Sequence, residues 1–200
     1  MTSKTISEAK QMQEAMKLKF TYRYGDRLEW EPESVAAHSW SMMLVADYLL
    51  AKLDSLAPWK YEMDRARIYQ LIAYHDLIEA ETWDEDLDPE NAVNHDAKWE
   101  KEAEAMKVFP SKLPVELRDV FISAAREYEA RETLESKFVK IVDIVEAEFF
   151  CHDKWYLFEN WTKEYQKSKR FHHFDDFPEL LYIQQDLIDH ADENYYSKDL

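Results

Sequence analysis

Apolar residues recur at intervals of three and four along nearly the whole 200-residue chain, and the strict apolar–polar alternation of β-strands is missing. The first helix is expected to open at a capping box, Thr5 to Glu8. Met12, Met16 and Phe20 then recur every fourth residue and are expected to pack into the core. The pattern predicts an all-α fold.

Later segments carry their own start and stop signals. Predicted helices begin with Ser34 as N-cap, with Asp64 as N-cap, near Asn94, at Pro114, near Thr133 and at Pro178. The helix that begins at Asp64 should run out between Glu81 and Asp84, and Pro110 should end the one that begins near Asn94. No internal repeat or linker interrupts the series, so we expect one domain over residues 1–200.

The second predicted helix places a histidine on its apolar face. His38 shares that face with Met42, Val45 and Leu49, because these residues are spaced by three or four positions. An inward histidine near a helix start is more often a hydrogen-bonded core residue than a ligand. His38 by itself therefore predicts no site.

The third predicted helix contains the stretch with the most chemistry, Tyr74 to Glu79. Its His75-Asp76 pair follows apolar positions, and an imidazole beside a carboxylate can hold a divalent cation. Helical spacing would place Glu79 one turn from His75 on the same face. A buried pair of this kind must be satisfied by a cation or by hydrogen bonds, and this helix alone leaves both readings open.

The His-Asp dipeptide occurs three times, so its setting has to distinguish the copies. His95-Asp96 lies in a polar stretch, His152-Asp153 leads into a lysine, and only His75-Asp76 is flanked by core positions. A similar signal comes from Asp143, which lies inside an apolar segment of the helix that begins near Thr133. Such an aspartate needs an arginine, a helix partner or a cation.

Composition excludes several classes of function. One glycine in the chain leaves no glycine-rich phosphate loop, which excludes Rossmann and P-loop chemistry. The net charge of −17 argues against binding to polymeric nucleic acid, while a small phosphorylated ligand held by a metal and one or two basic side chains remains possible. A single cysteine, a polar N-terminus and no bilayer-length apolar run predict a cytoplasmic protein that does not bind a membrane.

The candidate ligands follow the order His38, His75-Asp76, Asp143, each on a separate predicted helix. This H…HD…D order resembles the HD-domain metal-dependent phosphohydrolase superfamily. More narrowly, the segments ESVAAHS (33–39) and HDLIEA (75–80) resemble the 5′-deoxynucleotidases of the YfbR/HDDC2 type. The resemblance implies a single helical bundle of the HD type, with a core at about residues 17–151 and a C-terminal helical extension at 152–200.

A ligand set comes with this resemblance. It implies that His38, His75, Asp76 and Asp143 bind one divalent cation, and it leaves open whether the ion is Co, Mn, Zn, Ni, Fe or Mg.

The resemblance also implies roles around the metal. Glu79 and Asp84 would act on the attacking water. Arg23 would bind the phosphate, and Tyr24 would contact the sugar. The implied substrate is a deoxynucleoside 5′-monophosphate, and the implied products are deoxynucleoside and phosphate.

Three departures from the family pattern keep other functions open. Tyr24 stands where a tryptophan is common, Ala37 replaces a frequent acidic residue, and Trp83 replaces a frequent glycine. These changes keep a dATP-type triphosphohydrolase, like the phage enzymes, as an alternative. A non-catalytic HD module that binds nucleotide is a further alternative, which the intact ligand set opposes. The aromatic segment Trp155 to Trp161 leads us to expect a homo-oligomer, a dimer or larger.

Overall fold

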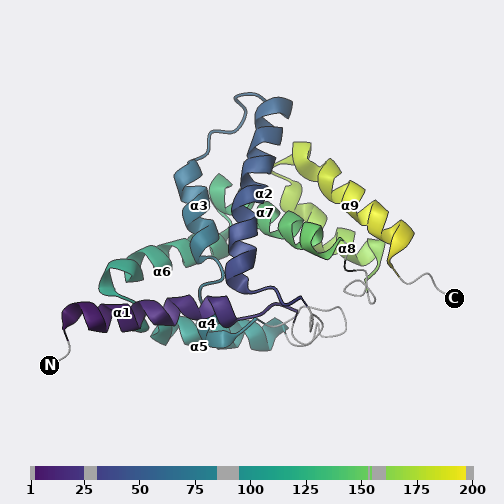
Figure 1. Cartoon of the computed structure of the whole chain (residues 1–200). Coiled ribbons are helices and arrows are strands. Elements are labelled where there is room, and N and C mark those ends of the chain that lie inside the picture. The colour runs from purple at the N-terminus through teal and green to yellow at the C-terminus, as the bar shows by residue number, and fades with distance from the viewer. Residues whose placement is uncertain (1–2, 25–30, 85–94, 153, 155–160, 197–200) are drawn as a thin grey trace. The chain divides into compact units, whose positions relative to one another are not determined.

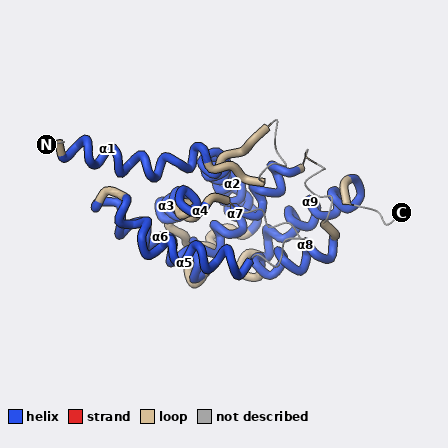
Figure 2. Tube along the Cα trace, turned by 90° about the horizontal axis from the view of Figure 1, so that it is seen from below, coloured by secondary structure: helices blue, strands red, loops and turns tan. Residues whose placement is uncertain are grey.

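The computed structural model describes residues 3–24, 31–84, 95–152, 154 and 161–196, and these form helices and turns without a β-strand (Figures 1 and 2). The elements, with η for 3₁₀ helices, are α1 (Lys4–Ala15), η1 (Met16–Phe20), α2 (Val35–Leu56), α3 (Arg65–Tyr74), α4 (Glu79–Thr82), α5 (His95–Lys112), α6 (Val115–Ala130), α7 (Leu134–Cys151), α8 (Lys163–Arg170), η5 (Phe171–Phe174), η6 (Pro178–Leu180) and α9 (Leu181–Asn194). The predicted all-α class is confirmed.

Three predicted helix starts are confirmed by side-chain caps. The Ser34 hydroxyl accepts a hydrogen bond from the Ala37 amide at 3.1 Å, and an Asp64 carboxylate oxygen accepts two amides at the start of α3. The Thr133 hydroxyl caps α7 in the same way. The capping box at Thr5 is wrong: Ser3 caps α1 by accepting from the Ile6 amide, because the helix already begins at Lys4.

The methionine stripe expected in the core is also wrong. No side chain of α1 is buried, and Met16 and Phe20 are 46% and 66% exposed. The α-helix ends at Ala15 and continues as the 3₁₀ helix η1, whose three-residue turns break the four-residue spacing of the stripe. Leu18 is the buried residue of η1 instead.

Two smaller expectations also differ. Pro110 lies inside α5, which runs on to Lys112, and α8 lies in a part of the expected helical extension for which no individual helix start was predicted.

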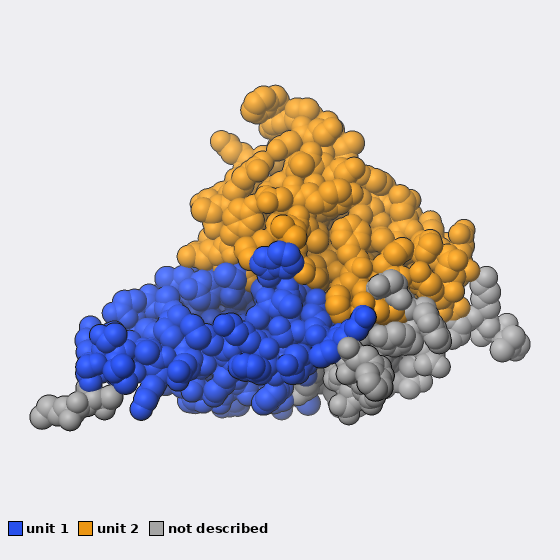
Figure 3. All heavy atoms as spheres, viewed as in Figure 1, with its two compact units in different colours: residues 1–40, 73–129 blue, residues 41–72, 130–200 orange. Residues whose placement is uncertain are grey.

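The chain forms two compact units (Figure 3). Unit 1 comprises residues 1–40 and 73–129, and unit 2 comprises residues 41–72 and 130–200. Each unit is discontinuous in sequence, because α2 and α3 both carry the chain from one unit into the other. That the chain is one domain remains a prediction.

The core of unit 1 gathers apolar side chains from η1, α2, the segment around α4, α5 and α6. Its buried members are Leu18, Val35, Leu77, Ile78, Ala80, Phe109, Leu113 and Phe121. The rings of Phe109 and Phe121 meet edge to face, with centroids 5.6 Å apart. Helix α4 contacts both η1 and α5, so the short segment that follows α3 is anchored on this core.

The core of unit 2 is built on α7. Phe138, Ile141, Val142 and Val145 are fully buried as predicted, whereas Phe149 of the same predicted stripe is 41% exposed. Phe138 packs edge to face on Phe177. Within the part of the chain that the structure describes, no helix is both long enough and apolar enough to cross a bilayer.

We predict that Phe121→Ala lowers the free energy of unfolding by about 3–5 kcal/mol, because a fully buried ring would leave a cavity beside Phe109. Urea denaturation followed by circular dichroism measures this loss. Val115→Ala on the same helix is the control, since Val115 is 62% exposed. Equal stability of the two variants would contradict the assigned core.

Candidate metal centre

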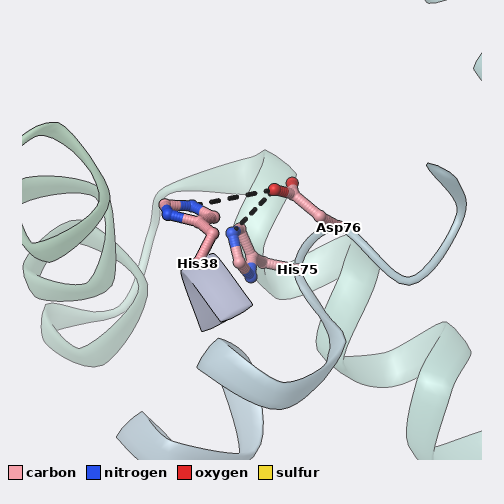
Figure 4. Close-up of side chains that lie close together, drawn as sticks. All are labelled: His38, His75 and Asp76. Atoms are coloured by element: carbon pink, nitrogen blue, oxygen red, sulfur yellow. Dashed lines mark ion pairs between the residues drawn. The ribbon is translucent and has the colours of Figure 1, made fainter. Parts of the chain in front are cut away.

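Two histidines and one aspartate converge in unit 1 (Figure 4). An Asp76 carboxylate oxygen lies 3.0 Å from Nε2 of His75 and 4.0 Å from Nε2 of His38. One potential ligand atom from each residue lies within 4.8 Å of the other two. Both histidine side chains are only 1% exposed, so the nitrogens meet the carboxylate away from bulk water.

The donor set fits a divalent metal ion. Two ligands about 2.1 Å from one ion, at right angles, lie about 3 Å apart, close to the observed His75–Asp76 separation. Two imidazole nitrogens and one carboxylate oxygen suit Mn, Fe, Co, Ni or Zn. Such an ion would satisfy the two buried imidazoles and the partly exposed Asp76 carboxylate at once.

The way helix α2 begins places His38 near His75 and Asp76. The cap at Ser34 starts α2, and His38 follows one turn later with 0% exposure. An antiparallel bridge between Tyr22 and Ser34 fixes the entry of the chain into the helix. His38 and its apolar neighbours Met42, Val45 and Leu49 are all buried, which confirms the face predicted from the sequence.

The segment that carries His75 and Asp76 differs from the predicted helix. Helix α3 ends at Tyr74, residues 75–78 form a turn, and α4 begins at Glu79. The Glu79 amide donates to the Asp76 carbonyl, three residues back instead of four. Side chains three apart nearly eclipse in such tight turns, so Asp76 and Glu79 share a side. His75 and Glu79 therefore do not lie one turn apart on a continuous helix, and that expectation is wrong.

A buried charged group adjoins the candidate ligands. Nζ of Lys98, on α5, lies 3.3 Å from a Glu79 carboxylate oxygen and 3.8 Å from Asp84 Oδ1. The side chains of Lys98, Glu79 and Asp84 are 16%, 6% and 15% exposed. Lys98 also pairs with Glu102 one turn along α5.

Burial shifts the protonation of both carboxylates. Burial, assisted by the negative charges of Asp76 and Asp84, raises the pKa of Glu79 well above its usual range, and Lys98 opposes this shift. Burial also raises the pKa of Asp84, although Lys98, Arg23 and the Tyr24 amide favour its charged form. A carboxylate whose pKa is displaced towards neutrality is suited to accept a proton.

Arg23, which was predicted to bind the phosphate, is held beside this network. Its Nη1 lies 2.8 Å from a carboxylate oxygen of Glu33, which is 5% exposed, and its guanidinium lies over the Tyr24 ring at 5.0 Å. The backbone bridge explains the pairing, because the Arg23 amide also donates to the Glu33 carbonyl at 2.9 Å. Arg23, Tyr24 and Asp84 therefore lie near one another, as the predicted roles require.

Trp83, where the sequence resemblance leads us to expect glycine, has a backbone conformation that favours glycine. Its φ of 65° and ψ of 155° lie in a region that only glycine enters easily. The strained residue turns the chain out of α4 directly before Asp84. Its indole is 62% exposed, so most of the ring lies in solvent and little of it is available to fill a pocket.

The other histidine and aspartate candidates are spread over the chain. Asp143 belongs to unit 2, where it pairs with Lys140 at 2.8 Å, and its place as fourth ligand remains a prediction. The His152 ring stacks on His190 at 4.5 Å, also in unit 2. The side chains of His95 and Asp96, and Asp153, lie outside the described residues.

Sequence reasoning missed Lys98 and Glu33. The strong charge of the helix predicted to begin near Asn94 indicates only that one face is largely exposed. Lys98 nevertheless lies seven and eleven positions before Ala105 and Phe109, and Phe109 is fully buried. That spacing places Lys98 on the inward face and could have revealed it. The bridge that pairs Glu33 with Arg23 joins residues ten positions apart, so no local pattern points to that pair.

Curated proteins similar to this chain share one name. The human 5′-deoxynucleotidase HDDC2 is 32% identical over 112 residues, and its bovine counterpart is 33% identical over 113 residues. Each match covers 56% of this chain and 50% of the relative. The match thus spans half the length of these relatives.

Solved structures show the same fold over nearly the whole chain. A predicted metal-dependent phosphohydrolase from Magnetospirillum magnetotacticum MS-1 has a TM-score of 0.73 at 22% identity and covers 98% of this chain and 100% of its own. The PH0347 protein from Pyrococcus horikoshii OT3 has a TM-score of 0.61 at 22% identity, with 92% and 98% covered. The model of the HD domain family matches residues 15–180, past the Cys151 limit inferred from the motifs, and the chain therefore belongs to the HD domain family.

Proposed function

We propose that this protein is a divalent-metal-dependent phosphohydrolase that acts on nucleotides, namely a 5′-nucleotidase that hydrolyses deoxynucleoside 5′-monophosphates to deoxynucleoside and phosphate. The observation that carries the proposal is the convergence of His38, His75 and Asp76 beside the buried carboxylate of Glu79. The shared name of the curated relatives supports the substrate class.

The metal-binding part of the proposal uses four residues. His38, His75 and Asp76 would supply three ligands, and Asp143 would supply the fourth. Four protein ligands would leave room on the ion for a water and a phosphate oxygen. When bound, the cation lowers the pKa of its water and offsets negative charge on the phosphoryl group.

The chain's own side chains would do the remaining chemistry. Glu79 takes a proton from the attacking water, whose oxygen forms the new bond to phosphorus. The bond between phosphorus and the sugar oxygen breaks in line, and the sugar oxygen takes a proton, from Glu79 or from solvent, as the deoxynucleoside leaves. Asp84, which also pairs with Lys98, orients the same water. Arg23 binds phosphate oxygens through its guanidinium group.

The acidic character of the chain favours a small substrate. At a net charge of −17, long-range repulsion disfavours a polyanion, whereas local charges can still hold one phosphate. Arg23 lies near the buried carboxylate of Asp84 and is the side chain proposed to hold that phosphate. The cytoplasmic location and the homo-oligomer remain predictions, and residues 155–160 of the aromatic segment lie outside the described residues.

We predict that His75→Ala abolishes metal binding while helical content persists, because it removes one of three converging ligands. Asp143→Ala should also lose metal if it supplies the fourth ligand. Elemental analysis of protein purified and dialysed in parallel measures occupancy. His152→Ala is the control and should keep its metal, since that ring stacks on His190. Full occupancy in His75→Ala would refute the centre, and full occupancy in Asp143→Ala would remove that residue from it.

We predict that Glu79→Gln lowers kcat by about 10²–10⁴-fold, as loss of a general base should, while bound metal is retained. Single-turnover phosphate release and metal content are measured on the same sample. Glu81→Gln on the same short helix is the control, since Glu81 pairs with Lys112 on the half-exposed side. A drop below about tenfold would remove Glu79 from proton transfer and assign the water to Asp84.

We predict that dAMP yields inorganic phosphate and that Arg23→Ala lowers kcat/KM by about 10–100-fold, because a charge-assisted contact with the phosphate is lost. Tyr24, in place of tryptophan, should relax the preference for deoxyribose over ribose. Products from dAMP, AMP and dATP are separated by ion exchange, with Lys19→Ala as a matched surface control. Release of intact triphosphate from dATP, with dAMP untouched, would instead establish the triphosphohydrolase reaction.

A further inference from the structure

Lys98 is a cation withdrawn from solvent among carboxylates. Its side chain is 16% exposed and reaches from α5 to Glu79 on α4, to Asp84 beyond α4, and to Glu102 on its own helix. A lysine on a charged helix usually extends into water and contributes little through ion pairs. Lys98 does the opposite, because both of its partners outside α5 are themselves buried.

The ammonium keeps its charge in this setting. Burial lowers the pKa of Lys98, but the negative charges of Glu79, Asp84, Glu102 and Asp76 together raise it above its ordinary value. A protonated lysine can donate three hydrogen bonds at once. The hydrogen bond that Lys98 donates to Glu79 is the shortest of its observed contacts. Without this cation, the largely buried carboxylates of Glu79 and Asp84 would lie beside the partly exposed Asp76 with no opposite charge from α5.

We propose that Lys98 is a positioning residue: its ammonium holds Glu79 and Asp84 at a fixed separation beside the metal centre and reduces the negative charge that the centre presents to a divalent cation. Lys98 thereby orients the group that takes the proton without itself contacting substrate. The consequence for turnover rests on the proposed function. The consequence for metal affinity follows from charge alone.

The contacts of Lys98 go beyond an ion pair within its own helix. The pair with Glu102 is an ordinary contact between residues four apart on one helix. The contacts with Glu79 and Asp84 join residues 19 and 14 positions away, and both carboxylates are more buried than Glu102. Loss of the ammonium should therefore affect the carboxylates of Glu79 and Asp84 more than that of Glu102.

The first test compares Lys98→Met, which keeps the length but removes the charge, with Lys98→Arg, which keeps the charge. We expect Lys98→Met to lower kcat for dAMP by about 10–100-fold with KM changed less than about threefold, and Lys98→Arg to recover much of kcat. Lys107→Met, an exposed lysine of the same helix, is the control. A kcat within about twofold of wild type, or no recovery by arginine, would overturn the positioning role.

The second test needs no substrate. Metal-free protein is titrated calorimetrically with Mn²⁺ at one pH and ionic strength. Removing a cation near the centre should tighten binding, so Lys98→Met is expected to bind Mn²⁺ about 3–30-fold more tightly than wild type, with Lys98→Arg and Lys107→Met unchanged. Damage to the fold would weaken binding instead. Unchanged or weaker affinity in Lys98→Met would overturn the proposal.

The two tests together distinguish failure of the proposed function, or of folding, from failure of the proposed role of Lys98. A wild-type protein that releases no phosphate from any nucleotide refutes the proposed function, while the Mn²⁺ titration still decides the role of Lys98. If Lys98→Met loses its helical circular dichroism signal, Lys98→Gln is titrated in its place, with the same two outcomes.

Discussion

Carboxylates withdrawn from water must each meet a cation or a hydrogen-bond donor, and unit 1 is arranged around that requirement. Glu33 is buried against Arg23, and Glu79 is buried against Lys98. Asp76 faces two imidazoles that have almost no solvent exposure. A helical core this small retains so many buried charges only where their pairing has a use, and their grouping at one place points to a site.

The backbone that holds these charges is less regular than the helices around it. The bridge between Tyr22 and Ser34 aligns Arg23 with Glu33, and the turn at residues 75–78 brings Asp76 and Glu79 onto one side. Trp83, at positive φ, then redirects the chain before Asp84. Each of these irregular points lies next to a charged side chain of the site, and at Trp83 the positive φ stores backbone strain there.

The spacing of apolar residues predicted correctly those helical faces whose apolar residues recur regularly over several turns. The inward face of α2, the caps at Ser34, Asp64 and Thr133, and most of the α7 stripe were correct, because several residues at regular spacing support each of them. The change from α1 to η1 was missed, because a stripe of Met12, Met16 and Phe20 looks the same whether or not the last turn tightens.

For the site, the sequence predicted which ligands come together but not which charged residues pair beside them. The motif placed His38, His75 and Asp76 together, and the structure brings them within reach of one ion. The pairing of Lys98 with Glu79 depends on how α5 packs against α4, which no local pattern reveals. The prediction that one helix continues through Glu79 was wrong. Hydrogen bonds of tight turns compete with helical ones over a few residues, and sequence spacing does not resolve that competition.

The central claim is that His38, His75 and Asp76 bind one divalent cation through the three atoms that face one another in Figure 4. Crystals grown with Mn²⁺ and measured at a wavelength where manganese scatters anomalously test it directly. The account predicts an anomalous peak within bonding distance of both Nε2 atoms and an Asp76 carboxylate oxygen. A well-ordered site with both imidazoles and Asp76 resolved but no peak among them, or a peak bound only by other residues, would contradict it.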